Sequence, residues 1–219
     1  MTPEISRRPL KTRDKDWPRR IAFRLVAFGL TPNQISLASV SLSGVGGACL
    51  ALAANQVGLL EATFFVIAAI CIQLRLLCNL LDGLMAVEGG LKTKTGEIFN
   101  EFPDRVADIL LCLAAGYSVR WDSAVAVQLG YLCAIASVLA AYVRVFGGSA
   151  GLIQDFCGPM AKQQRMAALT LSCIISATEA FLRWPHRVMS IVLAVIFLGS
   201  LFTAARRTVR IARLLNARS

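Results

Sequence analysis

The chain has 219 residues, 56% of them hydrophobic, and a formal net charge of +10. This apolar share exceeds the roughly 45–50% that is usual in soluble globular domains, which argues against a soluble protein. A basic chain can be a nucleic-acid-binding protein, but here the basic residues flank long apolar segments. We therefore expect a membrane protein with no nucleic-acid partner.

The chain begins with a basic segment, residues 1–30. Within it, residues 17–29 mix arginines with large apolar residues, a composition that suits an amphipathic helix in the membrane interface. A simple basic anchor is the alternative. The segment is longer than the basic region of a cleaved signal peptide, and a full-length apolar span follows it.

A sharp bend is predicted where this segment ends. Gly29 can end one helix, Thr31 can cap the next, and Pro32 suits the first helical position. The first span therefore begins at the membrane surface.

Six apolar segments follow. Residues 35–54, 124–143 and 188–205 contain no charged residue, and each is long enough to cross a hydrocarbon core of roughly 30 Å. Three more, at about 62–85, 98–119 and 163–182, carry charge. We predict an all-α bundle of six transmembrane helices in a domain of residues 31–205. A basic tail, 206–219, continues the last helix.

Basic residues are distributed unevenly about this bundle. Eighteen of the 23 Lys and Arg lie on the side of the two termini, three lie on the other side, and Arg75 and Arg105 lie within helices. The positive-inside rule then places both termini in the cytoplasm. We expect a multi-pass protein of the cell (inner) membrane whose basic flanks attract anionic lipid headgroups.

The connecting segments and the cysteines offer no candidate catalytic or metal-binding site. Residues 88–95 form a loop with Lys92 and Lys94, and Gly147 and Gly148 mark the start of a longer connection. No two of the seven cysteines have metal-ligand spacing, and they are expected to be small buried hydrophobic residues. The single histidine, His186, lies in a short outer loop, so histidine-based catalysis is not expected.

Five polar residues inside the second and third predicted spans form what we call the polar seam. Asn79 and Asp82 are spaced i, i+3, while Asn100, Asp104 and Asp108 are spaced i, i+4, i+8. Each spacing places its groups on one helical face. Oxygen ligands suit a hard divalent cation such as Mg²⁺, and acids inside a membrane usually mark function.

A structural interpretation of the polar seam stands beside the functional one. Arg75 and Arg105 lie close enough in sequence to pair with these acids, and polar residues can simply hold helices together. Residue spacing alone does not separate an ion site from a structural network.

The motif around the polar seam resembles the signature of the CDP-alcohol phosphotransferase family, D-x2-D-G-x2-A-R-x8-G-x3-D-x3-D. The run from Asn79 to Asp104 has this spacing throughout, and Asp82, Gly83, Ala86, Gly96 and Asp104 match in identity. The turn at Thr31-Pro32-Asn33 is similar to the one that opens the first transmembrane helix in that family. Six transmembrane helices after an amphipathic helix also match, so the resemblance covers nearly the whole chain.

The resemblance implies an enzyme of phospholipid biosynthesis, a CDP-alcohol phosphatidyltransferase. Such enzymes move a substituted phosphate from a CDP-linked donor such as CDP-diacylglycerol to an alcohol acceptor and release CMP. They use Mg²⁺ or Mn²⁺, with two divalent ions between four acidic positions, and they are commonly homodimers. The acceptor alcohol stays open.

Carried over by position, the resemblance assigns roles to individual residues. Asp104 is the catalytic base, and the metal ligands are Asn79, Asp82, Asn100 and Asp104, with Asp108 as a further candidate. Residues expected to border the donor are Pro32, Asn33, Gln34, Ile35, Gly83, Ala86, Val87 and Thr93. Residues expected to contact the acceptor are Arg144, Lys162 and Arg165, with ordinary positive-inside charge as the alternative.

Three positions depart from the signature, because Asn79 and Asn100 replace acids and Val87 replaces an arginine. The two amides remove two negative charges, which allows one metal ion rather than two. The two Asn and the extra Asp108 resemble the pattern of a variant subgroup of the family. Separately, Arg75 on the helical face of Asn79 is a candidate to replace the missing arginine or to balance the remaining charge. Two alternatives remain: an inactive relative that binds nucleotide-lipid or scaffolds lipid enzymes, and a transporter.

Overall fold

The computed structural model describes residues 15–91, 93–120, 123–184 and 187–218. Within these ranges the regular structure is helical, with no β-strand. The segment before residue 15, Lys92 and His186 lie outside the described residues. The helices are α1 (Asp16–Ala27), α2 (Pro32–Ala53), α3 (Leu59–Val87), α4 (Gly96–Tyr117), α5 (Ser123–Ser149), α6 (Lys162–Leu182) and α7 (Val188–Asn216).

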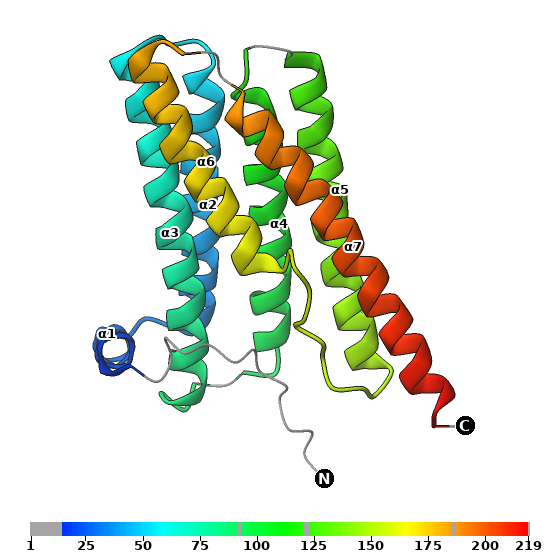
Figure 1. Ribbon diagram of the computed structural model, residues 1–219. Coiled ribbons are helices and arrows are strands. Elements are labelled where there is room, and N and C mark those ends of the chain that lie inside the picture. The colour runs from blue at the N-terminus through cyan, green and yellow to red at the C-terminus, as the bar shows by residue number, and fades with distance from the viewer. Residues whose placement is uncertain (1–14, 92, 121–122, 185–186, 219) are drawn as a thin grey trace.

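The six long helices form one bundle, and neighbours contact each other around the cycle α2–α3–α6–α7–α5–α4 (Figure 1). Five of them, all but α4, are long and apolar enough to cross a membrane. Helix α4 has 22 residues, which is also long enough, but it contains the charged part of the polar seam. The predicted all-α membrane bundle is therefore confirmed, and α4 differs from the other spans because of its charge.

Helix α1 lies across one end of the bundle and is seen end-on in Figure 1. The start of α2 and the C-terminal part of α7 lie at the same end, which we call the α1 end. Ala22 of α1 packs into a small apolar cluster with Leu81 and Met85 of α3. The helix thus buries its apolar face against α3 while its arginines stay outside, as an interfacial helix does.

The predicted bend between α1 and α2 is present. Gly29 has a positive φ of 80°, which few residues other than glycine adopt readily. The Thr31 side chain accepts a hydrogen bond from the Gln34 backbone N–H at 3.4 Å, and Gln34 Oε1 accepts one from the Thr31 N–H at 2.9 Å. These two bonds form a capping box, with Pro32 at the first helical position.

The prediction that Gly147 and Gly148 belong to a connection is wrong, because α5 continues to Ser149. A Cβ built on Gly147 would lie 2.8 Å from Ile211 Cδ1 of α7, so the glycine allows close packing of the two helices. This packing holds the end of α5 in helical form. Helix α7 correspondingly continues beyond the apolar span through most of the basic tail, as predicted.

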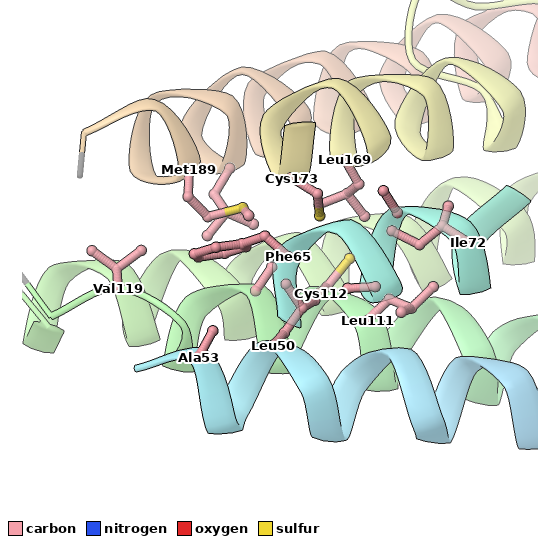
Figure 2. Close-up of a cluster of buried hydrophobic side chains, with 14 of the residues drawn as sticks. Leu50, Ala53, Phe65, Ile72, Leu111, Cys112, Val119, Leu169, Cys173 and Met189 are labelled. Carbon is pink, nitrogen blue, oxygen red and sulfur yellow. The ribbon is translucent and has the colours of Figure 1, made fainter. Parts of the chain in front are cut away.

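The apolar core fills the bundle away from the α1 end. Figure 2 shows Leu50, Phe65, Leu111, Leu169 and Met189 from five helices meeting there. Most of the cysteines are buried, as predicted, but Cys157 in the α5–α6 connection is exposed. Because this part of the bundle is tightly filled with apolar side chains, the polar residues gather nearer the α1 end.

Candidate functional site

A cavity of about 870 Å³ lies toward the α1 end of the bundle, and its wall includes residues from all six long helices. The α3–α4 loop and the α5–α6 connection complete it. Sequence segments more than a hundred residues apart therefore meet around one space. Its volume falls in the range of typical small-molecule sites.

Most of the predicted site residues line this cavity. They are Pro32, Asn33, Asn79, Asp82, Gly83, Ala86, Val87, Thr93, Asn100, Asp104, Arg144, Lys162 and Arg165. Three predicted residues are not part of its wall. Gln34 belongs to the capping box, Ile35 packs against the apolar cluster below α1, and Asp108 lies deeper in the bundle.

Asp82 has one satisfied and one unsatisfied carboxylate oxygen. Ser36 Oγ of α2 donates a hydrogen bond of 2.6 Å to Asp82 Oδ2, while Oδ1 is buried and has no hydrogen-bond partner among the described residues. A buried acceptor without a partner is unfavourable, so a bound cation would stabilise this oxygen. Ser36 was not predicted from the sequence, although Ser36, Ser39 and Ser43 form a polar stripe in an otherwise apolar span.

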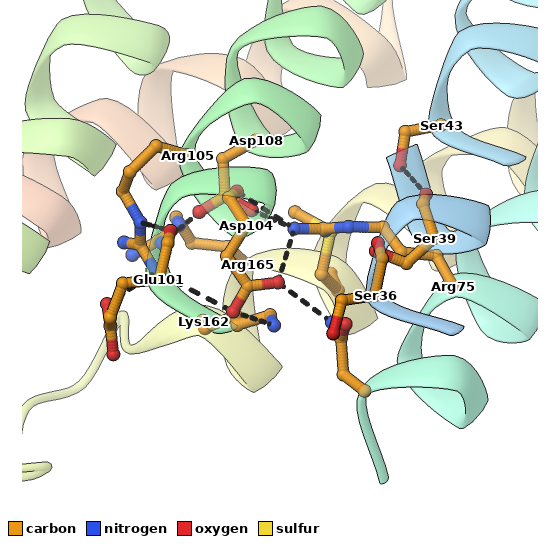
Figure 3. A network of polar contacts seen from close by, with 12 residues as sticks. Ser36, Ser39, Ser43, Arg75, Glu101, Asp104, Arg105, Asp108, Lys162 and Arg165 are labelled. Carbon is orange, nitrogen blue, oxygen red and sulfur yellow. Dashed lines mark hydrogen bonds and ion pairs between the residues drawn. The ribbon is translucent and has the colours of Figure 1, made fainter. Parts of the chain in front are cut away.

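Asp104 is surrounded by donors (Figure 3). Asn79 Nδ2 donates to its Oδ1 at 2.9 Å, and the Lys162 ammonium group donates to its Oδ2. Guanidinium nitrogens of Arg75 and Arg105 lie 3.7 Å from Oδ1 and Oδ2 respectively. Both oxygens of this carboxylate are therefore paired.

Asp108 is fully buried between two arginines. Arg75 Nη2 of α3 lies 2.6 Å from Oδ1, and Arg165 Nη2 of α6 lies 2.7 Å from Oδ2. Arg75 also donates to the Asp104 backbone carbonyl at 3.2 Å. This triad joins α3, α4 and α6. The structural interpretation of the polar seam anticipated the pairing of Arg75 with an acid but not that of Arg165. Because it offers no oxygen to the cavity, we do not propose Asp108 as a metal ligand.

Arg144 lies on the opposite wall and holds the α5–α6 connection. Its guanidinium group donates to Glu101 and to Gln154 at 2.6 Å, and it stacks 5.0 Å from the centre of the Phe156 ring. Glu101 also lies 3.5 Å from Arg105. The predicted acceptor residue is therefore positioned by its neighbours rather than mobile on the surface.

Arg207 of α7 also lines the cavity, and it was not predicted from the sequence. It donates to the Ala140 carbonyl at 2.8 Å and to the Cys157 carbonyl at 2.9 Å. In the sequence it is one of several arginines in the basic tail. Helical spacing places Arg207 on the buried face of α7 with Ser200 and Ile211, whereas Arg206 is exposed, so this periodicity is the signal that could have found it.

The cavity wall carries oxygen ligands of the kind that a hard cation prefers. The carboxylates of Asp82 and Asp104 and the amides of Asn79 and Asn100 all line the cavity. Among the described residues, no group of three or more His, Cys, Asp and Glu side chains is placed to hold a metal ion. The unpartnered Asp82 oxygen and the amide oxygens fit one divalent ion with water or substrate as further ligands.

Comparisons with known proteins agree with this geometry, although no family model matches the chain. The chain is 25% identical to inner membrane protein YnbA of Escherichia coli K12, over 79% of this chain and 82% of that protein. It is 27% identical to the phosphatidylinositol phosphate synthase of Mycolicibacterium smegmatis, over 81% of this chain and 77% of the synthase.

Two solved structures of the Mycobacterium tuberculosis phosphatidylinositol phosphate synthase are similar. The structure with CDP-DAG bound has a TM-score of 0.74 at 19% identity and covers 90% of this chain and 94% of its own. The complex with manganese and citrate has a TM-score of 0.72 at 20% identity, covering 89% and 88%. The chain has the fold of a phosphatidylinositol phosphate synthase. At this level of identity the likeness establishes the architecture, and function depends on the site.

Proposed function

We propose that this chain is a membrane-embedded CDP-alcohol phosphatidyltransferase of phospholipid biosynthesis. It moves a phosphatidyl group from CDP-diacylglycerol to an alcohol and releases CMP. The observation that carries the proposal is the convergence of Asp82, Gly83 and Asp104, at the spacing of the family signature, on one cavity. The synthase with the same fold binds CDP-DAG in its solved structure.

The donor occupies the part of the cavity between α2, α3 and the α3–α4 loop. Gly83, Ala86 and Thr93 line this part of the cavity. The small side chains of Gly83 and Ala86 would allow the nucleotide to approach the backbone, and the Thr93 hydroxyl would contact the donor phosphates. Pro32 and Asn33 border the same region from the start of α2. Val87 also lines this wall, and the two other predicted donor residues, Gln34 and Ile35, support it from outside.

Asp104 is the residue proposed to accept the proton of the acceptor hydroxyl. Its Oδ2 is held by Lys162 and its Oδ1 by Asn79, so the carboxylate is fixed in orientation toward the cavity. General base catalysis requires such a fixed carboxylate within hydrogen-bond reach of the hydroxyl. Asp82 would hold a divalent cation, Mg²⁺ or Mn²⁺, which would supply positive charge to neutralise the departing CMP.

The acceptor is proposed to enter between α4, α5 and α6. Arg144 and Lys162 present positive charge to this side of the cavity, and charged donors of this kind select a polar or anionic alcohol. Arg165 is 2% exposed and pairs with Asp108. We therefore propose that it positions the neighbouring residues of α6 rather than contacting the acceptor directly.

Orientation and assembly complete the proposal. The cavity lies toward the α1 end, where the arginines of α1 and the C-terminal part of α7 gather, so the positive-inside rule places that end in the cytoplasm. CDP-linked donors would then be reached from the cytoplasmic leaflet. A homodimer is proposed from the family resemblance alone.

The test is CMP release by the purified chain from CDP-diacylglycerol across a panel of alcohols and phosphorylated alcohols, with and without EDTA. Metal-dependent CMP release with a matching lipid product is the expected result. Absence of turnover with every donor and acceptor, in a protein that elutes as a single folded species, would contradict the proposal.

A second candidate function is that of an inactive relative that only binds the donor. Two observations favour it: three signature positions depart from the family, and Lys162 pairs with the proposed base Asp104. An inactive relative would bind CDP-diacylglycerol without releasing CMP. Binding measured by isothermal titration in the same preparations separates the two, since the enzyme converts the donor when an acceptor is added.

A further inference from the structure

Two of the three aspartates of the polar seam are already neutralised by protein cations. Asp108 pairs with Arg75 and Arg165, Asp104 pairs with Lys162, and Arg75 and Arg105 add further positive charge near Asp104. Asp82 is the exception among the three aspartates of the polar seam. It is 4% exposed, and in the part of the chain that the structure describes no group hydrogen-bonds to its Oδ1.

With this distribution of charge, the site does not fit a pair of divalent ions. Two such ions, roughly 3.5–4 Å apart, bring four positive charges and are normally held by bridging carboxylates. In this chain two of the four positions that the signature assigns to acids are Asn79 and Asn100, which bring no charge. The residues present therefore fit one divalent ion and do not fit two.

The Lys162 side chain lies where a second cation would have to bind. It projects from the start of α6, lines the cavity and bonds Asp104 Oδ2. On the other oxygen, Asn79 directs its NH₂ toward Oδ1, because a carboxylate can only accept. A metal ion at Asp104 would have to displace both donors and would lie close to the guanidinium groups of Arg75 and Arg105.

We propose that the Lys162 ammonium group takes the place of the second divalent ion, and that the site binds a single divalent ion at Asp82. The inference rests on the metal use in the proposed function. The loss of two acids and the presence of Lys162 are then parts of one arrangement, in which a fixed protein charge holds Asp104 and Asp82 would hold the single ion.

The experiment counts Mn²⁺ ions bound to the purified full-length chain in detergent, by electron paramagnetic resonance of free Mn²⁺ during titration. Wild-type protein is expected to bind one Mn²⁺ per chain, and Asp82→Asn to bind none. Lys162→Met removes the competing positive charge, so Mn²⁺ affinity should rise by roughly tenfold or more. The triple variant Lys162→Met, Asn79→Asp, Asn100→Asp should bind two.

Two matched controls separate local charge from general effects. Lys162→Arg keeps the positive charge and should keep one Mn²⁺ at wild-type affinity. Lys94→Met removes an exposed loop lysine outside the cavity wall and should change neither number nor affinity.

Wild-type protein that binds two Mn²⁺, or none while releasing CMP, overturns the inference without any variant having to fold. Lys162→Met with unchanged Mn²⁺ number and affinity overturns it as well. CMP release assayed on the same samples separates this failure from that of the proposed function. One bound Mn²⁺ without turnover would contradict the proposed enzyme activity but support the single-ion site. Turnover with two bound Mn²⁺ would support the enzyme activity but contradict the single-ion site.

Discussion

Arg75 Nη2 lies 2.6 Å from Asp108 Oδ1, and neither side chain has any exposed surface. The pair joins α3 to α4 in the middle of a bundle whose surroundings are apolar, and Arg165 completes it from α6. Removing one partner from a buried ion pair leaves an uncompensated charge, which is far costlier than losing a surface pair.

Asp108→Asn should therefore destabilise the protein by about 3–5 kcal/mol, because it leaves both Arg75 and Arg165 without a counter-charge. Arg75→Met should cost less, since Asp108 still pairs with Arg165. Thermal unfolding in detergent, followed by circular dichroism, measures both. An equal loss of stability in the two variants would contradict the assignment of Asp108 as the shared partner of both arginines.

Asp82→Asn and Asp104→Asn should each reduce CMP release below detection in a protein that still folds, and Asp104→Asn should also lower the melting temperature because Lys162 loses its counter-charge. The first removes the anionic metal ligand, and the second removes the proposed base. The matched control is Glu88→Gln, which makes the same carboxyl-to-amide change in a surface pair with Arg19. Full turnover in Asp104→Asn would refute its assignment as the base.

Ser36→Ala should lower kcat/KM by roughly tenfold, because Asp82 loses its 2.6 Å donor and is no longer held in one orientation. Ser43→Ala is the control, since Ser43 bonds only the Ser39 carbonyl of its own helix. Mn²⁺ affinity should weaken in the first variant and not in the second. A Ser36→Ala enzyme with wild-type kinetics would show that Asp82 needs no support from α2.

EDTA should abolish CMP release, and Mn²⁺ or Mg²⁺ added in excess should restore it, because hard cations exchange readily at a site of oxygen ligands. Restoration is expected to be hyperbolic in metal concentration for one bound ion. A sigmoidal response would indicate that more than one ion is required.

Asp155 in the α5–α6 connection should make the folded protein less stable as the pH falls into the acid range. Burial raises the pKa of Asp155, but the Cys157 backbone N–H at 2.8 Å and the Arg210 guanidinium at 3.2 Å outweigh burial and hold the pKa below its usual value. The stabilising contribution is therefore complete above the ordinary carboxyl pKa and is lost as pH falls through the lowered one.

The measurement compares the melting temperatures of wild type and Asp155→Asn across pH. The difference should be largest near neutral pH and should shrink as Asp155 becomes protonated. A difference that stays constant down to strongly acid pH would mean that the ion pair contributes nothing.

The helices and the faces they present follow from local sequence. The capping box at Thr31 and Gln34, the apolar spans, and the alignment of Asn79 with Asp82 and of Asn100 with Asp104 all depend on contacts within a few residues. Helical periodicity expresses such contacts directly. For the same reason the family signature, which is a spacing of residues along two helices, is recognisable in the amino-acid sequence alone.

The partner of each acid, by contrast, follows from how the helices pack against one another. Asp104 meets Lys162 from a position 58 residues away, Asp82 meets Ser36 across 46, and Asp108 pairs with arginines of α3 and α6. A periodic pattern states which face of a helix is polar and says nothing of which neighbour covers that face. Buried charge must be paired, but tertiary packing selects the partner.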